Sequence, residues 1–155
     1  MTDLDLCFRS AFELASDIRT KKVSPVEVIE NALARIDQVN PKVNGFCFVY
    51  ADEAMDKARH AEADIQAGKD VGPLHGVPFA IKDFTPTAGK KTTLGSKIFE
   101  HWVPDQDPPL VERLLDAGGI MIGMRSFGAS APADKLYAKF GITADAVVAA
   151  ARQAL

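Results

Sequence analysis

Cysteine is scarce in this 155-residue sequence, which holds only two, Cys7 and Cys47. Neither cysteine has a metal-ligand spacing to the other or to the three histidines, so no metal site is predicted. Two isolated cysteines in a chain of this length also fit reduced thiols in the cytosol better than a disulfide scaffold. We therefore expect both as reduced, buried thiols in a reducing compartment.

Long apolar runs and an excess of positive charge are absent as well. No apolar stretch approaches the roughly 20 residues that cross a bilayer, and the first residues lack the basic start and apolar core of a signal peptide. The formal net charge of -3 gives no basis for binding nucleic acid or an anionic membrane. These features predict a cytoplasmic protein with no nucleic acid and no membrane as partner.

Apolar residues at helical spacing predict amphipathic helices over residues 8–18, 24–40, 54–68 and 107–119. Ser24, Pro25 and Glu27 form a capping-box start, and Asn40-Pro41 is expected to stop that helix. The expected buried faces comprise Phe8, Ala11, Phe12, Ala15 and Ile18; Val26, Ile29, Leu33 and Ile36; Ala54, Ala58, Ala61 and Ile65; and Val111, Leu114 and Leu115.

Short apolar runs predict buried strands at residues 46–50, 77–81 and 120–122. The alternation of helices and strands then predicts an α/β fold, with layered helices around a partly parallel, mixed sheet. Residues 84–106 have no periodic pattern, and a loop of that length is usually functional or disordered. Beyond Gly123, Thr143 can cap an alanine-rich helix to Leu155, which offers little apolar area and is expected to need a neighbour.

Lys82 is the main candidate for chemistry, because the apolar strand delivers it, followed by Asp83, at its far end. Burial there would disfavour the charged ammonium, and such a lysine can act as the general base for a serine in Ser–Lys variants of the nucleophilic triad. The alternative is that Lys82 pairs with Asp83 or another carboxylate and only closes the strand. Residue type alone leaves both interpretations open.

Residues from about 8 to 123 resemble the amidase signature family of serine amide hydrolases. The likeness rests on the order and spacing of Val23-Ser24-Pro25-Val26-Glu27, Asn40-Pro41, Asn44-Gly45-Phe46, Leu74-His75-Gly76-Val77-Pro78, Ile81-Lys82-Asp83, Thr92-Thr93-Leu94-Gly95-Ser96, Ala117-Gly118-Gly119-Ile120 and Gly123. The resemblance implies that Lys82 is the catalytic lysine of a Ser-Ser-Lys triad. It also implies hydrolysis of a small-molecule carboxamide through an acyl-enzyme, with no metal or organic cofactor.

In that family the lysine acts through a bridging serine, in a cis peptide, on a nucleophilic serine, and both serines lie in a downstream Gly/Ser-rich segment. No Gly-Ser-Ser-Gly-Gly run occurs in these 155 residues. The backbone amides of that run would also form the oxyanion hole, and loss of a single donor there costs about 100- to 1000-fold in rate. The resemblance therefore implies a truncated amidase-signature fold that is inactive alone.

Residues from about 122 to 155 resemble instead the extreme C-terminus of a bacterial transketolase. The segments that carry this likeness are Gly123-Met124, Phe127-Gly128-Ala129-Ser130-Ala131-Pro132, Leu136-Tyr137 and Phe140-Gly141-Ile142-Thr143. A Glu-Phe pair that the amidase family would place after Gly123 is missing. The two likenesses divide the chain into an amidase-like unit, 1–123, and a helical tail, 124–155, that supplies packing but no catalytic residue. A transketolase fragment is disfavoured for the whole chain because only the tail carries that likeness.

Three serines remain as stand-in nucleophiles: Ser96, Ser126 and Ser130. Ser96 is expected to be a turn residue, Ser130 a helix cap, and Ser126 a neighbour of the junction. His75 and Trp102 are expected to pack structurally. The alternative function is a non-catalytic fusion module that binds a partner or itself, since truncating a sheet leaves an open edge that favours a homo-oligomer.

Overall fold

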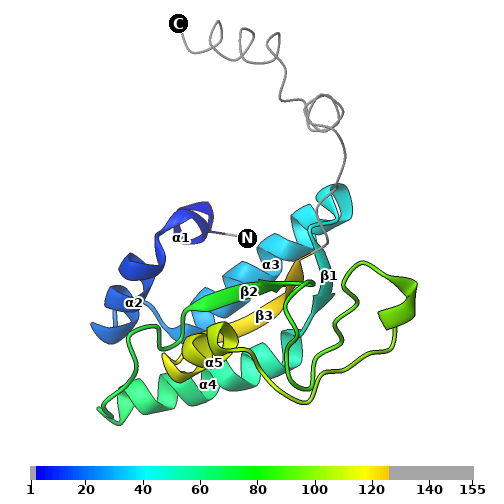
Figure 1. The fold of residues 1–155 in the computed structure, drawn as a ribbon. Helices are drawn as coiled ribbons and strands as arrows, with labels where there is room; N and C mark the ends of the chain where they lie inside the picture. Colours follow the sequence, from blue (N-terminus) through cyan, green and yellow to red (C-terminus); the bar gives the residue numbers. More distant parts are fainter. Residues whose placement is uncertain (1–2, 126–155) are drawn as a thin grey trace, which may run out of the picture.

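The computed structural model describes residues 3–125. Its elements, in chain order, are α1 (Leu4–Phe8), α2 (Ala11–Arg19), α3 (Pro25–Val43), β1 (Phe46–Val49), α4 (Ala51–Gln66), β2 (Pro78–Lys82), the 3-10 turn η1 (Lys97–Phe99), α5 (Pro109–Asp116) and β3 (Ile120–Arg125) (Figure 1). Ser126, Ser130 and the helices expected in the tail lie outside the described residues. None of the helices within residues 3–125 has both the length and the apolarity needed to cross a bilayer.

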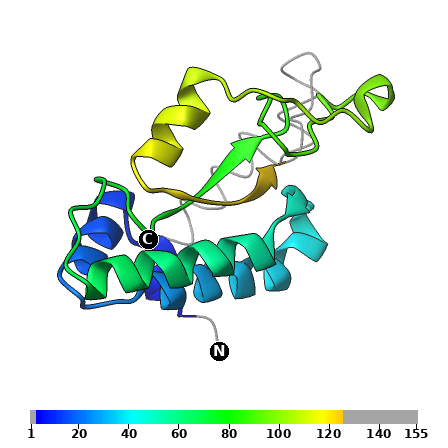
Figure 2. The ribbon, with the colours of Figure 1, turned by 90° about the horizontal axis from the view of Figure 1, so that it is seen from below.

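The three strands form a mixed sheet in the order β1-β3-β2, with β3 in the centre. Strand β3 pairs antiparallel with β1 and parallel with β2. Helices α3 and α4 cover one face of the sheet and α5 lies on the other (Figure 2). This arrangement confirms the expected α/β class with a partly parallel sheet.

Residues 3–125 contain three apolar clusters, and two of them follow from the alternation of side chains along β3. Ile120 and Ile122 pack with α3 and α4, whereas Met121 between them packs with Ile81 and with Val111 of α5. Helix α4 has the small buried face that its sequence predicts. Ala54, Ala58 and Ala61 pack in the cluster of Ile120 and Ile122, whereas Ile65 packs with Ile18 of α2 in another cluster. Small side chains allow α4 to lie close to both α3 and the sheet.

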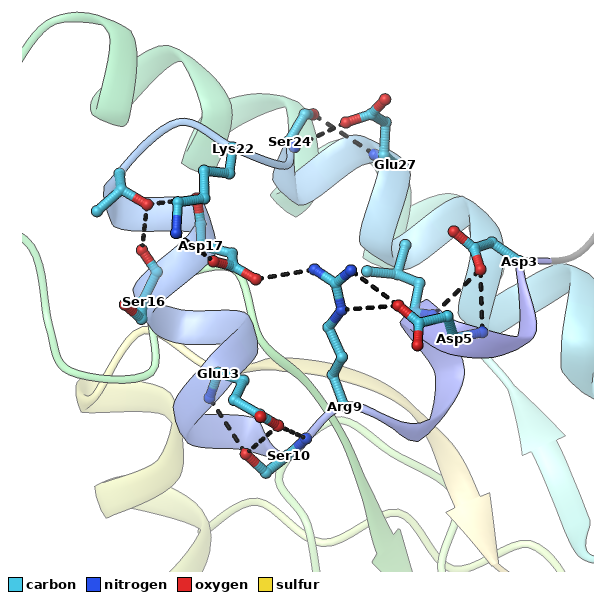
Figure 3. A network of polar contacts seen from close by, with 12 residues as sticks. Asp3, Asp5, Arg9, Ser10, Glu13, Ser16, Asp17, Lys22, Ser24 and Glu27 are labelled. Atoms are coloured by element: carbon cyan, nitrogen blue, oxygen red, sulfur yellow. Dashed lines mark hydrogen bonds and ion pairs between the residues drawn. The ribbon is translucent and has the colours of Figure 1, made fainter.

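The first expected helix is in fact two. Arg9 has an extended backbone, and Ser10 starts α2 with a capping box: the Glu13 amide donates to the Ser10 hydroxyl, and the Ser10 amide donates to the Glu13 carboxylate (Figure 3). This restart changes the buried face to Leu14, Ala15 and Ile18, so the expected burial of Phe8, Ala11 and Phe12 is wrong. Phe8 and Phe12 are 78% and 82% exposed.

Arg9 joins the two short helices electrostatically. Its guanidinium contacts Asp5 of α1 at 2.9 Å and Asp17 of α2 at 2.8 Å, and Lys22 adds a second contact to Asp17 at 3.3 Å (Figure 3). Just beyond Lys22, the expected capping box of Ser24 and Glu27 starts α3. Polar contacts between neighbours in sequence thus set the directions of α1, α2 and α3.

Asn40-Pro41 does not end α3, which continues to Val43. Pro41 removes one backbone donor, and only Lys42 and Val43 follow it in the helix. The helix ends instead at Asn44, whose amide still donates to the Asn40 carbonyl at 2.7 Å and whose left-handed backbone (φ 47°) turns the chain out of the helix. The Asn40 side chain then bonds the backbone of Phe46, at 2.8 and 3.2 Å, where β1 begins.

The expected burial of both cysteines is also wrong: Cys47 is exposed, Cys7 is half-buried, and both are free thiols. Strand β1 lies at the edge of the sheet, and its residues alternate between half-buried and exposed. An edge strand covered on one face buries only every second side chain. The apolar run at 46–50 therefore forms a strand, but not a fully buried one.

The parallel pairing of β2 with β3 begins in a close contact between two loops. Leu74 N–H donates to Ala117 O at 2.8 Å, Gly76 N–H to Gly118 O at 3.0 Å, and Ile120 N–H to Val77 O at 2.8 Å. Gly118 is left-handed (φ 84°), and a Cβ there would lie 2.8 Å from the Cα of His75. Glycine is thus required at this position for both conformation and space.

Replacing Gly118 by alanine is expected to destabilise the chain by roughly 2 to 4 kcal/mol, because backbone strain adds to the clash with His75. Gly68 is the matched control: it is also left-handed (φ 68°), but a Cβ added there would meet nothing within 4 Å. Gly68→Ala should cost only about 1 kcal/mol. Urea unfolding measures both, and equal losses would contradict the steric argument.

Candidate functional site

Lys82 ends β2 at the carboxyl edge of the parallel strand pair, where it is in register with Arg125 of β3. The preceding residue, Ile81, is buried against Met121 and Val111. Within residues 3–125 the Lys82 side chain is exposed, so the expectation that the apolar strand buries Lys82 is wrong. The strand is apolar because α5 covers it, and that cover does not extend over its last side chain.

Asp83, the next residue, is 2% exposed. Its Oδ1 accepts from the Thr93 amide at 2.7 Å, its Oδ2 accepts from the Thr93 hydroxyl, and its carbonyl accepts from the Leu94 amide at 3.1 Å. A buried carboxylate is stable only when hydrogen bonds replace its hydration, and Thr93 provides donors to both oxygens. The residues that follow Lys82 are therefore tied to a turn ten residues further along the chain.

The turn that Asp83 holds has an unusual backbone. Leu94 and Gly95 are both left-handed, with φ of 52° and 67°. For a leucine this conformation costs about 1 to 2 kcal/mol, so surrounding contacts must maintain it. The strained turn lies within hydrogen-bonding distance of the residue that follows the candidate base.

The loop over residues 84–106, expected to be irregular, is ordered by contacts along its length (Figure 1). Thr92 N–H donates to Trp102 O at 3.0 Å, and Gly89 N–H to Pro104 O at 2.9 Å. Asp107, which lies just before α5, accepts from the Ala88 amide at 2.7 Å. The loop is thus folded back on itself at the carboxyl edge of β2.

A lysine also fastens this loop to the rest of the fold. Lys90 bonds Glu53 of α4, and its Nζ lies 4.4 Å from the centre of the Tyr50 ring. The contacts with Lys90 and Lys57 lower the pKa of Glu53, in that order, below its ordinary value of 4.5. The 84–106 loop is therefore fixed to α4 by charge as well as by backbone hydrogen bonds.

Burial raises the pKa of the Tyr50 phenol, and the charges of Glu53 and Asp83 raise it further. The pKa of the Cys47 thiol is raised in the same way, first by partial burial and then by the charge of Asp83. Cys47 lies in β1 and Tyr50 directly follows it, so the fold places this part of the chain near Asp83. Sequence reasoning missed both residues, since nothing local indicates that β1 pairs beside β3.

Ser96 has the turn role expected of it. Its hydroxyl accepts from the Ile98 amide at 3.2 Å at the start of η1, and its own amide donates to Thr93 O at 2.9 Å. His75 is also structural: its Nε2 lies 3.1 Å from the carbonyl oxygen of Ala61. Trp102 lies at a rim, 36% exposed and 5.5 Å from the Phe99 ring. Across residues 3–125, no group of three or more His, Cys, Asp or Glu side chains is placed to hold a metal ion.

Comparison with known proteins gives a consistent family. A family model described as Amidase matches residues 27–132, which extends past the boundary expected near Gly123. A glutamyl-tRNA(Gln) amidotransferase subunit from Acidothermus cellulolyticus is 45% identical over 119 residues, covering 77% of this chain and 24% of that protein. The protein of the same name from Salinispora tropica is 40% identical over 140 residues, or 90% of this chain and 28% of that one.

Solved structures agree. A bacterial aryl acylamidase of the amidase signature enzymes has a TM-score of 0.71 at 29% identity, over 76% of this chain and 25% of that one. A fatty acid amide hydrolase has a TM-score of 0.75 at 25% identity, over 81% of this chain and 22% of that one. The chain thus spans about a quarter of the length of the relatives it matches.

The contact between Glu53 and Lys90 predicts a pH-dependent stability. Because folding lowers the pKa of Glu53, its contribution is present above about pH 4.5 and is lost as the pH falls through the lower folded value. Glu53→Gln should cost at most about 1 kcal/mol near neutral pH, since Glu53 is partly exposed. In chemical unfolding at about pH 2.5, where Glu53 is protonated in both states, the free energies of unfolding of the variant and the wild type should be equal. Glu100→Gln, at an exposed position, is the control, and a Glu53→Gln effect independent of pH would contradict the prediction.

Proposed function

This chain belongs to the amidase family, and we propose that its residues supply Lys82 as the base of a Ser-Ser-Lys amide hydrolase but supply neither serine. The observation that carries the proposal is the place of Lys82 at the carboxyl end of a parallel strand, followed at once by a buried carboxylate and an ordered turn. Carboxyl edges of parallel strands are where α/β folds bind ligands. This position supports a catalytic role better than a role in closing the strand.

The proposed chemistry is acyl transfer to water. A serine oxygen attacks the amide carbonyl, and its proton passes through the bridging serine to Lys82 and then to the leaving amine; water afterwards releases the acid. A base works best when water is excluded from it, whereas Lys82 is exposed among the described residues. We therefore propose that the segments that exclude water from this lysine belong to the remainder of the relatives' fold, which residues 3–125 do not match.

The substrate is proposed to be a carboxamide, with no metal or organic cofactor. The relatives' names span a glutamyl-tRNA(Gln) amidotransferase, an aryl acylamidase and a fatty acid amide hydrolase. The three names share a reference to an amide, and nothing in residues 3–125 indicates which groups flank that amide in the substrate. The proposal therefore names the reacting bond and leaves the side groups of the substrate open.

The 155-residue chain alone is expected to hydrolyse neither a simple aryl amide nor the matching ester above the rate of Lys82→Ala. The reason is the lack of a Gly-Ser-Ser-Gly-Gly run, which would supply nucleophile, relay and oxyanion hole together. Release of the aryl amine or phenol measures both reactions. Turnover that depends on Lys82 would contradict the proposal, and Ser96→Ala, Ser126→Ala and Ser130→Ala would then identify the serine responsible.

A chimera gives the positive arm of this experiment. Residues 1–123 of this chain would replace the matching segment of the Acidothermus cellulolyticus relative. The chimera should keep amide hydrolysis, and Lys82→Ala within it should lower kcat by at least about 100-fold, as expected for loss of a general base. Lys57→Ala, on α4, is the control. An active chimera that is indifferent to Lys82→Ala would overturn the role assigned to Lys82.

The alternative function, a module that only associates with itself or a partner, is favoured by one surface observation. Within residues 3–125, β1 and β2 are the outer strands of the sheet, and Phe8, Phe12 and Ile98 are each more than three-quarters exposed. Open strand edges and exposed aromatic side chains both favour association.

Sedimentation velocity at micromolar concentration is therefore expected to show species larger than a monomer. Phe12→Ser should shift the distribution toward monomer, because it removes exposed apolar area without touching a core cluster. Lys69→Ser, at an exposed polar position, is the control for a change of surface residue. A single monodisperse monomer in the wild type would rule out self-association.

A further inference from the structure

Asp83 is buried beside Lys82, and the proposed chemistry gives it no task. Its carboxylate and carbonyl together accept three hydrogen bonds, from the Thr93 amide, the Thr93 hydroxyl and the Leu94 amide. Two consecutive residues of a distant turn are thus bound to one residue at the end of β2. An aspartate that only closed a strand would need no such set of partners.

The Thr93 hydroxyl connects Asp83 to the inside of the turn. It donates to Asp83 and accepts from the Gly95 amide at 3.2 Å, so a single side chain links the carboxylate to the left-handed residues Leu94 and Gly95. A leucine keeps a positive φ only where its surroundings over-determine the backbone, and such positions cluster at functional sites. The contacts of Asp83 provide that over-determination here.

The main chain of Lys82 is restrained on two sides. On one side β2 is paired in register with β3, and on the other the Thr85 amide donates to the Lys82 carbonyl at 2.9 Å while Asp83 binds the turn. The exposed Lys82 side chain therefore extends from a backbone that is held on both sides. We infer that Asp83 is a positioning residue, whose carboxylate holds the turn from Thr93 to Ser96 and thereby fixes Lys82.

The inference rests on the proposed function for the chemistry of Lys82, but its test needs no turnover. In the full chain, Asp83→Ala should speed hydrogen exchange at the Thr93 and Leu94 amides by at least about tenfold. The Thr93 amide loses its acceptor, the carboxylate, and the Leu94 amide loses the turn that holds it against the Asp83 carbonyl. The Ile120 and Ile122 amides in the centre of the sheet should exchange as before. Asp70→Ala, which changes an exposed aspartate, is the matched control and should alter neither set.

The second readout is the side chain of Lys82, followed by the carbon-13 resonance of its Cε. In Asp83→Ala this resonance should shift and sharpen toward that of an unrestrained lysine, whereas the Lys69 signal should stay unchanged. Thr93→Val should produce part of the same shift, and Thr93→Ser, which keeps the hydroxyl, should restore the wild-type position. An aspartate with a merely structural role would lower the melting temperature without this graded change at Lys82.

Unaltered Lys82 and Thr93 signals in a folded Asp83→Ala chain would overturn the inference. If that variant does not fold, the pair Thr93→Val and Thr93→Ser decides, because both keep the buried carboxylate and its bond from the Thr93 amide. Loss of activity in the chimera with an intact Lys82 signal would count against the proposed function and leave the positioning role standing. The two failures are therefore distinguishable.

Discussion

The parallel pairing of β2 with β3 is the contact on which the candidate site depends. It begins where the loop before β2 meets the loop before β3, with Ile120 N–H bound to Val77 O at 2.8 Å. Gly118 allows this approach, because any Cβ there would overlap His75. From that start the pairing continues to Lys82 and Arg125, with one shift of register between Phe79 and Ala80.

The carboxyl edge of the pair is organised by polar contacts more than by apolar packing. Asp83 binds Thr93, Glu53 binds Lys90, and Asp107 binds the Ala88 amide, so that three acidic side chains order the 84–106 loop. Such contacts have strict geometry, which suits a segment that must present groups at defined places. The apolar clusters lie beneath the edge and give it a rigid base. This division between a packed base and a hydrogen-bonded edge is what a chemical site on an α/β fold requires.

Features that depend on neighbours in sequence were predictable. The capping box of Ser24 and Glu27 and the alanine face of α4 are local patterns, and both appear in the structure. The break at Arg9 and Ser10 was missed even though its signal, a serine followed three residues later by Glu13, was present in the sequence. The stop expected at Asn40-Pro41 was wrong, since α3 continues past the proline to Val43 and ends at the left-handed Asn44. Local rules thus predicted most elements but not every boundary.

The family followed from the resemblance of the sequence to known amidases. The α/β class and the place of Lys82 at the end of an apolar strand followed from the sequence by itself, because spacing and periodicity are local properties. Only the tertiary structure decided that Lys82 and Cys47 are exposed, that Tyr50 lies near the charge of Asp83, and that Thr93 is the partner of Asp83. Each of these depends on which strand is central and how a long loop returns. Those arrangements come from the summed burial of distant residues, which no short stretch of sequence contains.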